Sequence, residues 1–121
     1  MKSFAYKKGI FYCEDVSIKE LCKIKETPFY IYSSKCIKDK FNALESRLKK
    51  TNYLIAYAVK ANSNIAILKL LASFGAGADV VSLGELRKAN LAGIPYDKVV
   101  YSGVGKKDRE IAFAIEAGIM Q

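Results

Sequence analysis

The sequence contains no histidine, and it has only two prolines and three cysteines among its 121 residues. Without histidine the chain lacks the side chain that most often transfers protons near neutral pH and most often binds metals. The cysteines are Cys13, Cys22 and Cys36. Their odd number and the absence of C-x-x-C spacing argue against a disulfide framework and against a zinc site. We therefore expect no bound metal and reduced thiols, as is typical of a cytoplasmic protein.

Long apolar runs are absent as well. No stretch approaches the ~18 consecutive apolar residues that predict a membrane span. The N-terminus also lacks the continuous apolar segment of a signal peptide. We expect a cytoplasmic protein that does not associate with membranes.

Acidic residues are outnumbered, with 20 lysines and arginines against 12 aspartates and glutamates, which gives a formal net charge of +8. Such an excess can indicate a nucleic-acid partner. The lysines are spread along the chain, however, without an arginine-rich block or aromatic residues alternating with them. We prefer a solvated lysine-rich surface. The alternative, nucleic-acid binding, would be recognised by an affinity that falls steeply with salt.

The first third of the sequence predicts a mixed region. With 51% hydrophobic residues the chain has the composition of a small globular protein. Residues 9–12 and 28–32 resemble short strands on either side of a short helix at 17–23. A longer helix is predicted from an N-cap at Ser33 or Ser34 to about Lys49. Its apolar stripe consists of Ile37, Phe41, Leu44 and Leu48.

The remaining residues predict strands and helices in alternation. The expected strands are 53–59, 78–82 and 98–102, and the expected helices are 63–74 with a Ser63 cap, 83–92 and 108–117. Each helix is followed by a glycine, where a left-handed backbone is least costly. Such alternation predicts a parallel sheet with right-handed crossovers, either open or closed into a barrel. Residues 119–121 resemble the opening of a fourth strand.

Lys60 is the first candidate site residue. In a strand from 53 to 60 it shares a face with Ala56 and Ala58, which leave space beside its amine. Leu54 and neighbouring strands would supply a dry environment that favours the uncharged, nucleophilic amine. Such lysines form Schiff bases with carbonyl compounds, including pyridoxal phosphate. The alternative is a lysine at a strand end that only reaches solvent.

Two acidic residues follow in the next strand and helix, near the edge where parallel strands build active sites. Asp79 lies in an otherwise apolar strand, where an unpaired carboxylate is costly. Lys60 is its expected partner, and a capping or loop-facing aspartate is the alternative. Glu85 opens the following helix, where the helix dipole favours a carboxylate without any catalytic role.

The glycine-rich turn Gly103-Val104-Gly105-Lys106 invites comparison with phosphate-binding loops. It lacks the spacing of G-x-x-x-x-G-K-[ST] and of G-x-G-x-x-G. We interpret it as a tight turn from a strand to a helix.

Together these segments resemble the diaminopimelate decarboxylases, which are pyridoxal-phosphate enzymes of the alanine racemase-like barrel fold related to ornithine and arginine decarboxylases. The resemblance extends from Thr27 to the end of the chain. It is strongest in residues 57–62, in 75–82 with 84–86, and in 101–106 with 116–119. It implies an α/β fold: a partial (β/α)8 TIM-type barrel of about three β/α units over residues 33–121, preceded by a lead-in from the family's β-rich domain over residues 1–32.

The resemblance also assigns residues. Lys60 matches the lysine that forms a Schiff base with pyridoxal phosphate, Ala58 matches a small residue beside the cofactor, and Asp79 matches an acidic residue close to the Schiff base. The turn at residues 102–105 is more similar to the diaminopimelate branch than to the ornithine branch. Leu83 departs from the glycine that is common at its position.

The activity implied by the resemblance is decarboxylation of meso-diaminopimelate to L-lysine and carbon dioxide, by a homodimer in the complete enzyme. The family's ring-stacking histidine, phosphate-binding glycine-rich loop, acidic partner of the pyridine nitrogen, and C-terminal cysteine and tyrosine have no counterpart in this sequence. We therefore expect an N-terminal portion that is inactive alone. The alternatives are an ornithine, arginine or polyamine-precursor decarboxylase of the same fold, and a non-catalytic remnant or regulatory homologue that acts by protein interaction.

Overall fold

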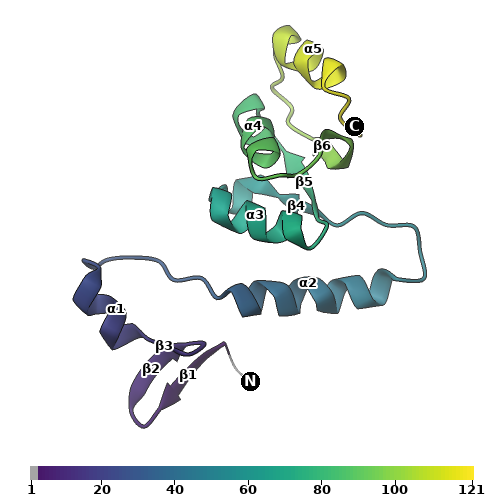
Figure 1. Ribbon diagram of the computed structural model, residues 1–121. Coiled ribbons are helices and arrows are strands. Elements are labelled where there is room, and N and C mark those ends of the chain that lie inside the picture. The colour runs from purple at the N-terminus through teal and green to yellow at the C-terminus, as the bar shows by residue number, and fades with distance from the viewer. Residues whose placement is uncertain (1–2) are drawn as a thin grey trace. The chain divides into compact units, whose positions relative to one another are not determined.

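The computed structural model describes residues 3–121, whose backbone forms two compact units divided between Leu44 and Glu45 (Figure 1). We call the residues up to Leu44 unit 1 and those from Glu45 onward unit 2. Each unit contains one three-stranded sheet. The chain is thus an α/β protein, as expected. Among the described residues, no helix combines the length and the apolar character needed to span a membrane.

Unit 1 begins with an antiparallel sheet of β1 (Phe4–Lys7), β2 (Ile10–Cys13) and β3 (Val16–Ser17). Lys8 and Gly9 join the first two strands, and both have positive φ angles. Two consecutive residues of that conformation suit the right-handed twist of a hairpin. The sequence predicted the strand at 9–12 to within one residue but did not predict β1.

Two helices complete the description of unit 1. They are α1 (Ile18–Ile24) and the first part of α2 (Ser34–Leu48), and both lie within one residue of their predicted bounds. The expected strand at 28–32 is wrong, because those residues form no strand. An apolar, aromatic run becomes a strand only where a neighbouring strand accepts its backbone hydrogen bonds, and none of the described strands pairs with this one.

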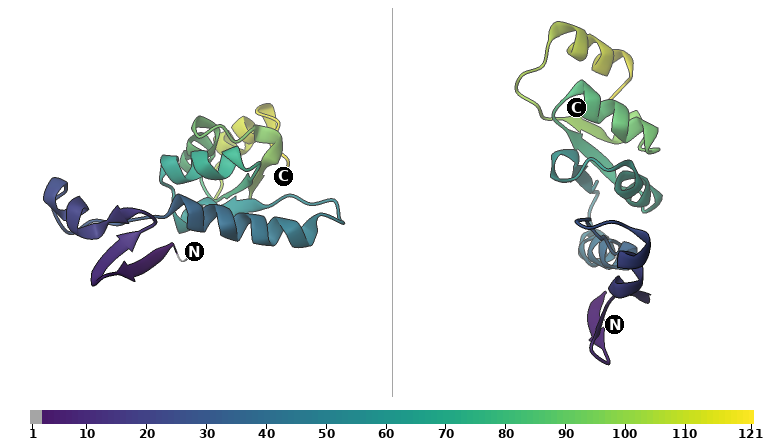
Figure 2. Two further views of the ribbon diagram at one scale, coloured as in Figure 1. Left: turned by 60° about the horizontal axis from the view of Figure 1, so that its bottom comes forward. Right: turned by 90° about the vertical axis from the view of Figure 1, so that its left-hand side faces the viewer.

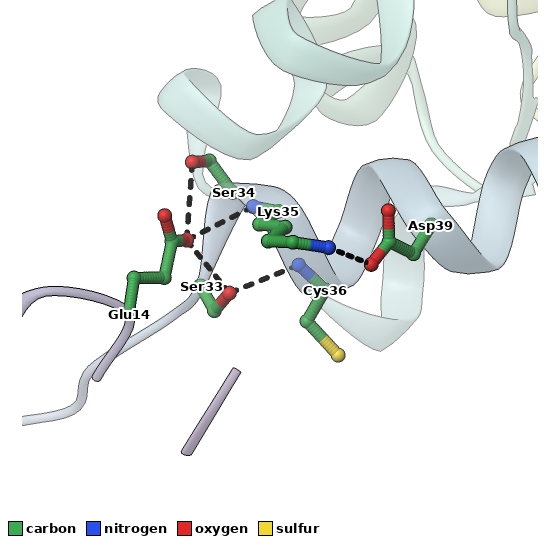
Figure 3. Close-up of polar contacts among 6 residues, drawn as sticks. All are labelled: Glu14, Ser33, Ser34, Lys35, Cys36 and Asp39. Carbon is green, nitrogen blue, oxygen red and sulfur yellow. Dashed lines mark hydrogen bonds and ion pairs between the residues drawn. The ribbon is translucent and has the colours of Figure 1, made fainter. Parts of the chain in front are cut away.

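The start of α2 is held by a carboxylate from the β2–β3 turn (Figure 3). Glu14 Oε1 accepts hydrogen bonds from Ser33 Oγ at 2.7 Å, Ser34 Oγ at 3.3 Å and Lys35 N at 2.9 Å. Ser33 Oγ in turn accepts from Cys36 N at 2.9 Å, so Ser33, not Ser34, is the N-cap. The bond from the Lys35 amide, followed by that from Ser33, lowers the pKa of the Glu14 carboxyl.

Unit 2 alternates strands and helices, as expected. After the end of α2 come β4 (Ala56–Ala58), the 3-10 turn η1 (Val59–Ala61), α3 (Ile65–Ser73), β5 (Gly77–Val80), α4 (Leu83–Leu91), the 3-10 turn η2 (Tyr96–Lys98), β6 (Val99–Tyr101) and α5 (Asp108–Glu116). The strands pair in the order β4-β5-β6, and both pairs are parallel. The parallel sheet is therefore confirmed.

Two local predictions in unit 2 are wrong. The strand expected at 53–59 is reduced to Ala56–Ala58, since Val59–Ala61 wind into η1. The N-cap of α3 is Asn64, whose side chain accepts from Ala66 N at 2.9 Å. Ser63 does not cap this helix, and its hydroxyl accepts instead from Lys88 Nζ at 2.9 Å.

The three helices of unit 2 end in the same way. Gly75, Gly93 and Gly118 each follow the last helical turn with φ between 71° and 92°. After each glycine the next amide bonds back into the helix, from Ala76 to Leu71, from Ile94 to Ala89 and from Ile119 to Ala114. These are Schellman motifs, in which a glycine in the left-handed conformation lets the following amides donate to the free carbonyls at the helix end. The glycine prediction is confirmed.

The core of unit 2 is formed by the sheet with helices α3, α4 and α5, which Figure 2 shows from two further sides. On β5, Ala78 and Val80 are fully buried, whereas Asp79 between them is half-buried. The side chains with no exposed surface include Val59, Leu68, Leu86, Ile94 and Val99. Each such aliphatic side chain contributes about 1.5–3 kcal/mol when it is removed from water.

Residues 119–121 return along the outer edge of β6. Met120 N donates to Val99 O at 3.0 Å, and Tyr101 N donates to Gln121 O at 2.7 Å. Residue numbers increase in the same direction along the two bonded segments, as they do in a parallel pair of strands. This agrees with the expected opening of a further strand.

Candidate functional site

The carboxyl ends of β4, β5 and β6 meet at one edge of the parallel sheet. Across this edge Ala58 pairs with Asp79, and Asp79 pairs with Val100, so the three residues form one row. Neighbours in a parallel row point to the same face. That face is opposite to the one buried by Ala78 and Val80. The structure therefore brings two predicted site residues, Ala58 and Asp79, side by side on the face that the helices leave open.

Lys60 lies beyond this row, after the strand has ended. It lies in η1, two residues beyond Ala58, and its side chain is exposed. The preceding Val59 is fully buried and anchors the turn. The dry environment that the sequence led us to expect around the amine is therefore not found in the described structure. The amine is open to solvent at the carboxyl edge.

Asp79 has a different partner from the one expected. Ser102 Oγ donates a short hydrogen bond to Asp79 Oδ1. Within residues 3–121 the ion pairs join Lys7 to Asp15, Lys23 to Glu20 and Lys35 to Asp39. The predicted pairing of Lys60 with Asp79 is wrong for this structure. The reason is geometric, because β4 ends at Ala58 and Lys60 lies in the turn η1, whereas Ser102 directly follows β6 and its hydroxyl reaches Asp79.

Ser102 is held in place by its backbone and by the next residue. Its amide donates to Val80 O at 3.0 Å, which extends the pairing of β5 with β6 by one step. At Gly103 a Cβ atom would lie 2.3 Å from Val81 O, a distance that no side chain tolerates. Glycine therefore lets the exit of β6 lie directly against the end of β5. Sequence reasoning missed Ser102, although it had marked the glycine turn that fixes it.

Glu85 serves the start of α4. Its Oε2 accepts from Val81 N at 2.9 Å, while its own amide donates to Ser82 Oγ at 3.2 Å. These reciprocal bonds connect the end of β5 to the first turn of the helix. They agree with the interpretation of Glu85 as a helix-opening residue.

The turn after β6 is closed by Lys106. Its Nζ donates to Gly103 O at 2.8 Å and lies 5.0 Å from the centre of the Tyr101 ring, within cation–π range. Burial, followed by the negative charge of Glu110, raises the pKa of the Tyr101 phenol. The ammonium group of Lys106 thus contacts the backbone of its own turn and the ring of Tyr101. This agrees with its interpretation as a tight turn and not as a phosphate-binding loop.

The residues at this edge fit one part of pyridoxal phosphate. An exposed primary amine at Lys60 suits its aldehyde, and the small side chain of Ala58 leaves space next to the Asp79 carboxylate. No counterpart of the family's loop for the phosphate occurs in the sequence. Among residues 3–121, no group of three or more histidine, cysteine, aspartate or glutamate side chains is arranged to hold a metal ion.

Comparison with known proteins agrees with this chemistry. The family described as "Pyridoxal-dependent decarboxylase, pyridoxal binding domain" matches residues 34–121. Diaminopimelate decarboxylase of Aquifex aeolicus is 47% identical over 115 residues, which are 95% of this chain and 27% of the relative. The enzyme of Neisseria meningitidis serogroup B is 42% identical over 108 residues, which are 89% of this chain and 26% of the relative.

A solved structure is similar over nearly the same range. It is diaminopimelate decarboxylase of M. jannaschii in complex with L-lysine, with a TM-score of 0.89 and 40% identity. The similarity covers 96% of this chain and 28% of that one. The chain thus spans about a quarter of the length of the curated relatives that it matches.

Proposed function

Because this chain belongs to the pyridoxal-dependent decarboxylase family, we propose that it forms the Schiff-base side of a cofactor site in a diaminopimelate decarboxylase. The reaction is the conversion of meso-diaminopimelate to L-lysine and carbon dioxide, with pyridoxal phosphate as the cofactor. The observation that supports this most strongly is local. An exposed lysine amine lies two residues beyond a row in which a small residue and a carboxylate are neighbours, at the carboxyl edge of a parallel sheet.

The roles of the residues follow from their positions. Lys60 would hold the cofactor covalently through its amine, which η1 directs away from the buried core. Ala58 would leave room for the planar ring, and the Asp79 carboxylate would stabilise a positive charge on a nearby nitrogen. When it is bound, pyridoxal phosphate supplies an electron sink for the electron pair that the departing carboxyl group leaves behind.

We propose further that β4, β5 and β6 are consecutive strands of a (β/α)8 barrel. Their parallel order and the pairing of residues 119–121 along β6 support this, as does the similarity to the M. jannaschii enzyme. In this proposal residues 33–121 belong to the barrel, and residues 1–32 are a lead-in that belongs to the family's β-rich domain.

The complete enzyme is proposed to be a cytoplasmic homodimer without nucleic-acid or membrane partners. The free thiols of Cys13, Cys22 and Cys36 are consistent with a reducing compartment. Among substrates of this fold, meso-diaminopimelate is preferred to ornithine, arginine or polyamine precursors, because the similar proteins named above are diaminopimelate decarboxylases.

The test is covalent trapping. The purified chain is incubated with pyridoxal phosphate and reduced with borohydride, and the adduct is located by peptide mapping. We expect the label on Lys60, its loss in Lys60→Ala, and its retention in a matched control, Lys69→Ala, which removes an exposed lysine from α3. Label scattered over the surface lysines, or unchanged by Lys60→Ala, would contradict the proposal and favour a non-catalytic homologue.

The same assay addresses the substrate. Addition of meso-diaminopimelate before reduction should decrease the label on Lys60, since a bound substrate amine competes with the lysine for the cofactor. Ornithine at equal concentration should decrease it less. The reverse order would favour the ornithine branch.

A further inference from the structure

The helix α5, the last helix of unit 2, has one packed side and one exposed side (Figure 1). On the packed side, the centre of the Phe113 ring lies 6.4 Å from that of Tyr96 and 5.9 Å from the guanidinium carbon of Arg87 on α4. On the other side, Ile111 and Ile115 are 41% and 72% exposed. Residues four apart share one face of a helix, so these isoleucines form a continuous apolar surface.

This surface is one wall of an open groove. The residues that line the groove are Tyr101, Lys106, Ile111, Ala114, Ile115, Ile119 and Gln121. Tyr101 is paired with Val80, whose side chain points to the face of the sheet that the helices cover, so the groove opens on that face. In the part of the chain that the structure describes, α3 exposes no large apolar side chain and α4 exposes Leu91 alone. The groove therefore distinguishes α5 from the two helices before it.

The course of the chain indicates what fits this groove. The helix α5 connects β6 to residues 119–121, which bond in parallel along the outer edge of β6. Connections between parallel strands are right-handed in nearly all proteins, which keeps successive helices on the same face of the sheet. A helix that follows residues 119–121 by the same course lies beside α5 on that face. This is the place of the groove.

We propose that the groove between α5 and residues 119–121 is the docking surface for the next helix and strand of the barrel. This inference rests on the proposed function, because it takes β4, β5 and β6 to be strands of the barrel of a diaminopimelate decarboxylase. The partner is a helix whose apolar stripe packs on Ile111 and Ile115, while its strand pairs along residues 119–121. The relatives have the chain to supply it, since the matched segment is 27% of the Aquifex aeolicus enzyme.

The experiment supplies this partner as a separate molecule. A fluorescent synthetic peptide carries the sequence that directly follows the matched segment of the Aquifex aeolicus enzyme and includes one helix and one strand. It is titrated with the full 121-residue chain, and binding is followed by anisotropy. Ile115→Lys should weaken binding by about 10- to 100-fold, the effect of no longer burying an isoleucine. Ile115→Leu, which stays apolar, should bind nearly as well as the original chain.

The matched control is Ile24→Lys. Ile24 ends α1 in unit 1 and is 74% exposed, so this variant adds the same charge at a helix position of similar exposure. It should leave the affinity unchanged. Because both isoleucines are exposed, neither variant should unfold the chain, which circular dichroism checks. Hydrogen exchange gives a second readout, in which the peptide should increase protection of the amides in α5 and leave those in α1 unchanged.

Three results would overturn the inference. They are the absence of peptide binding, an equal loss of affinity in Ile115→Lys and Ile24→Lys, and self-association of the chain that requires Ile115, which would assign the groove to a second copy. None of these measurements uses pyridoxal phosphate. Failed trapping with successful peptide binding would overturn the cofactor role alone, while successful trapping without peptide binding would overturn the docking surface alone.

Discussion

The two units of the chain are stabilised by different means. In unit 2, large side chains such as Leu68, Leu86 and Ile94 are fully buried between the sheet and its helices. In the described part of unit 1, the buried residues are Cys13, Ser33 and Phe41, while many apolar side chains stay exposed. The exposed large ones are Phe4, Tyr6, Ile10, Phe11, Val16, Ile24, Tyr30, Tyr32 and Leu44.

Hydrogen bonds largely define unit 1. Its strands are joined by tight turns into an antiparallel sheet. The start of α2 is bonded to the Glu14 carboxylate, which accepts three hydrogen bonds. Unit 2 instead repeats one structural pattern. In each repeat a strand and a helix share an apolar interface, and a glycine follows the helix. The comparison teaches that one chain can contain a region with its own core and another region whose apolar side chains stay exposed.

The largest effect should come from opening the core of unit 2. Leu68→Ala removes a fully buried side chain and should lower the free energy of unfolding by about 2–5 kcal/mol. Leu44→Ala, at a position that is 49% exposed in unit 1, should cost much less. Denaturant unfolding followed by circular dichroism compares the two. Equal losses would mean that the contrast between the units does not exist in solution.

A smaller effect is expected from glycine replacements. In Gly103→Ala the new Cβ would meet Val81 O, and relief of that overlap should cost about 1–3 kcal/mol. The control is Gly105→Ala in the same turn, where a Cβ would have no neighbour within 4 Å. In thermal unfolding, Gly103→Ala should lower the midpoint while Gly105→Ala leaves it nearly unchanged. A similar fall in both would show that the turn, and not its approach to β5, limits stability.

The smallest effect should be a response of unit 1 to acid. The pKa of Glu14 is lowered in the folded chain, so its stabilising contribution is present above the ordinary pKa of a glutamate, about 4.3. That contribution is lost as the pH falls from there through the lowered folded value. Hydrogen exchange of the Lys35 amide should therefore become less protected in acid than that of amides in β5.

Glu14→Gln is the matched variant for this experiment. Its neutral side chain does not titrate, so protection of the Lys35 amide should become nearly independent of pH below 5. Acid-induced loss of protection that persists in Glu14→Gln would assign the effect to another group.

Much of unit 2 could be predicted because its signals are local. Gly75, Gly93 and Gly118 indicated helix ends, since the left-handed conformation depends on the residue itself. The alternation of strands and helices followed from short-range periodicity. The prediction of a strand at 28–32 was wrong because a β-strand requires a pairing partner, which the local sequence does not identify.

The candidate site was predicted only in part. Ala58 and Asp79 are neighbours in one row, while their roles toward a cofactor, like that of Lys60, remain predictions. The pairing of Lys60 with Asp79 was wrong because it assumed that the strand continued to residue 60. A single 3-10 turn, with Val59 buried at its start, was enough to change that geometry.

The sequence by itself thus determined the helices, their glycine ends, the parallel α/β order and the small-residue setting of Lys60, because these depend on conformational preferences over a few residues. Only the tertiary structure decided that Lys60 is exposed and that Asp79 is held by Ser102, 23 residues away. That contact depends on the register between β5 and β6, which is set by backbone pairing and by the close approach of Gly103 to Val81.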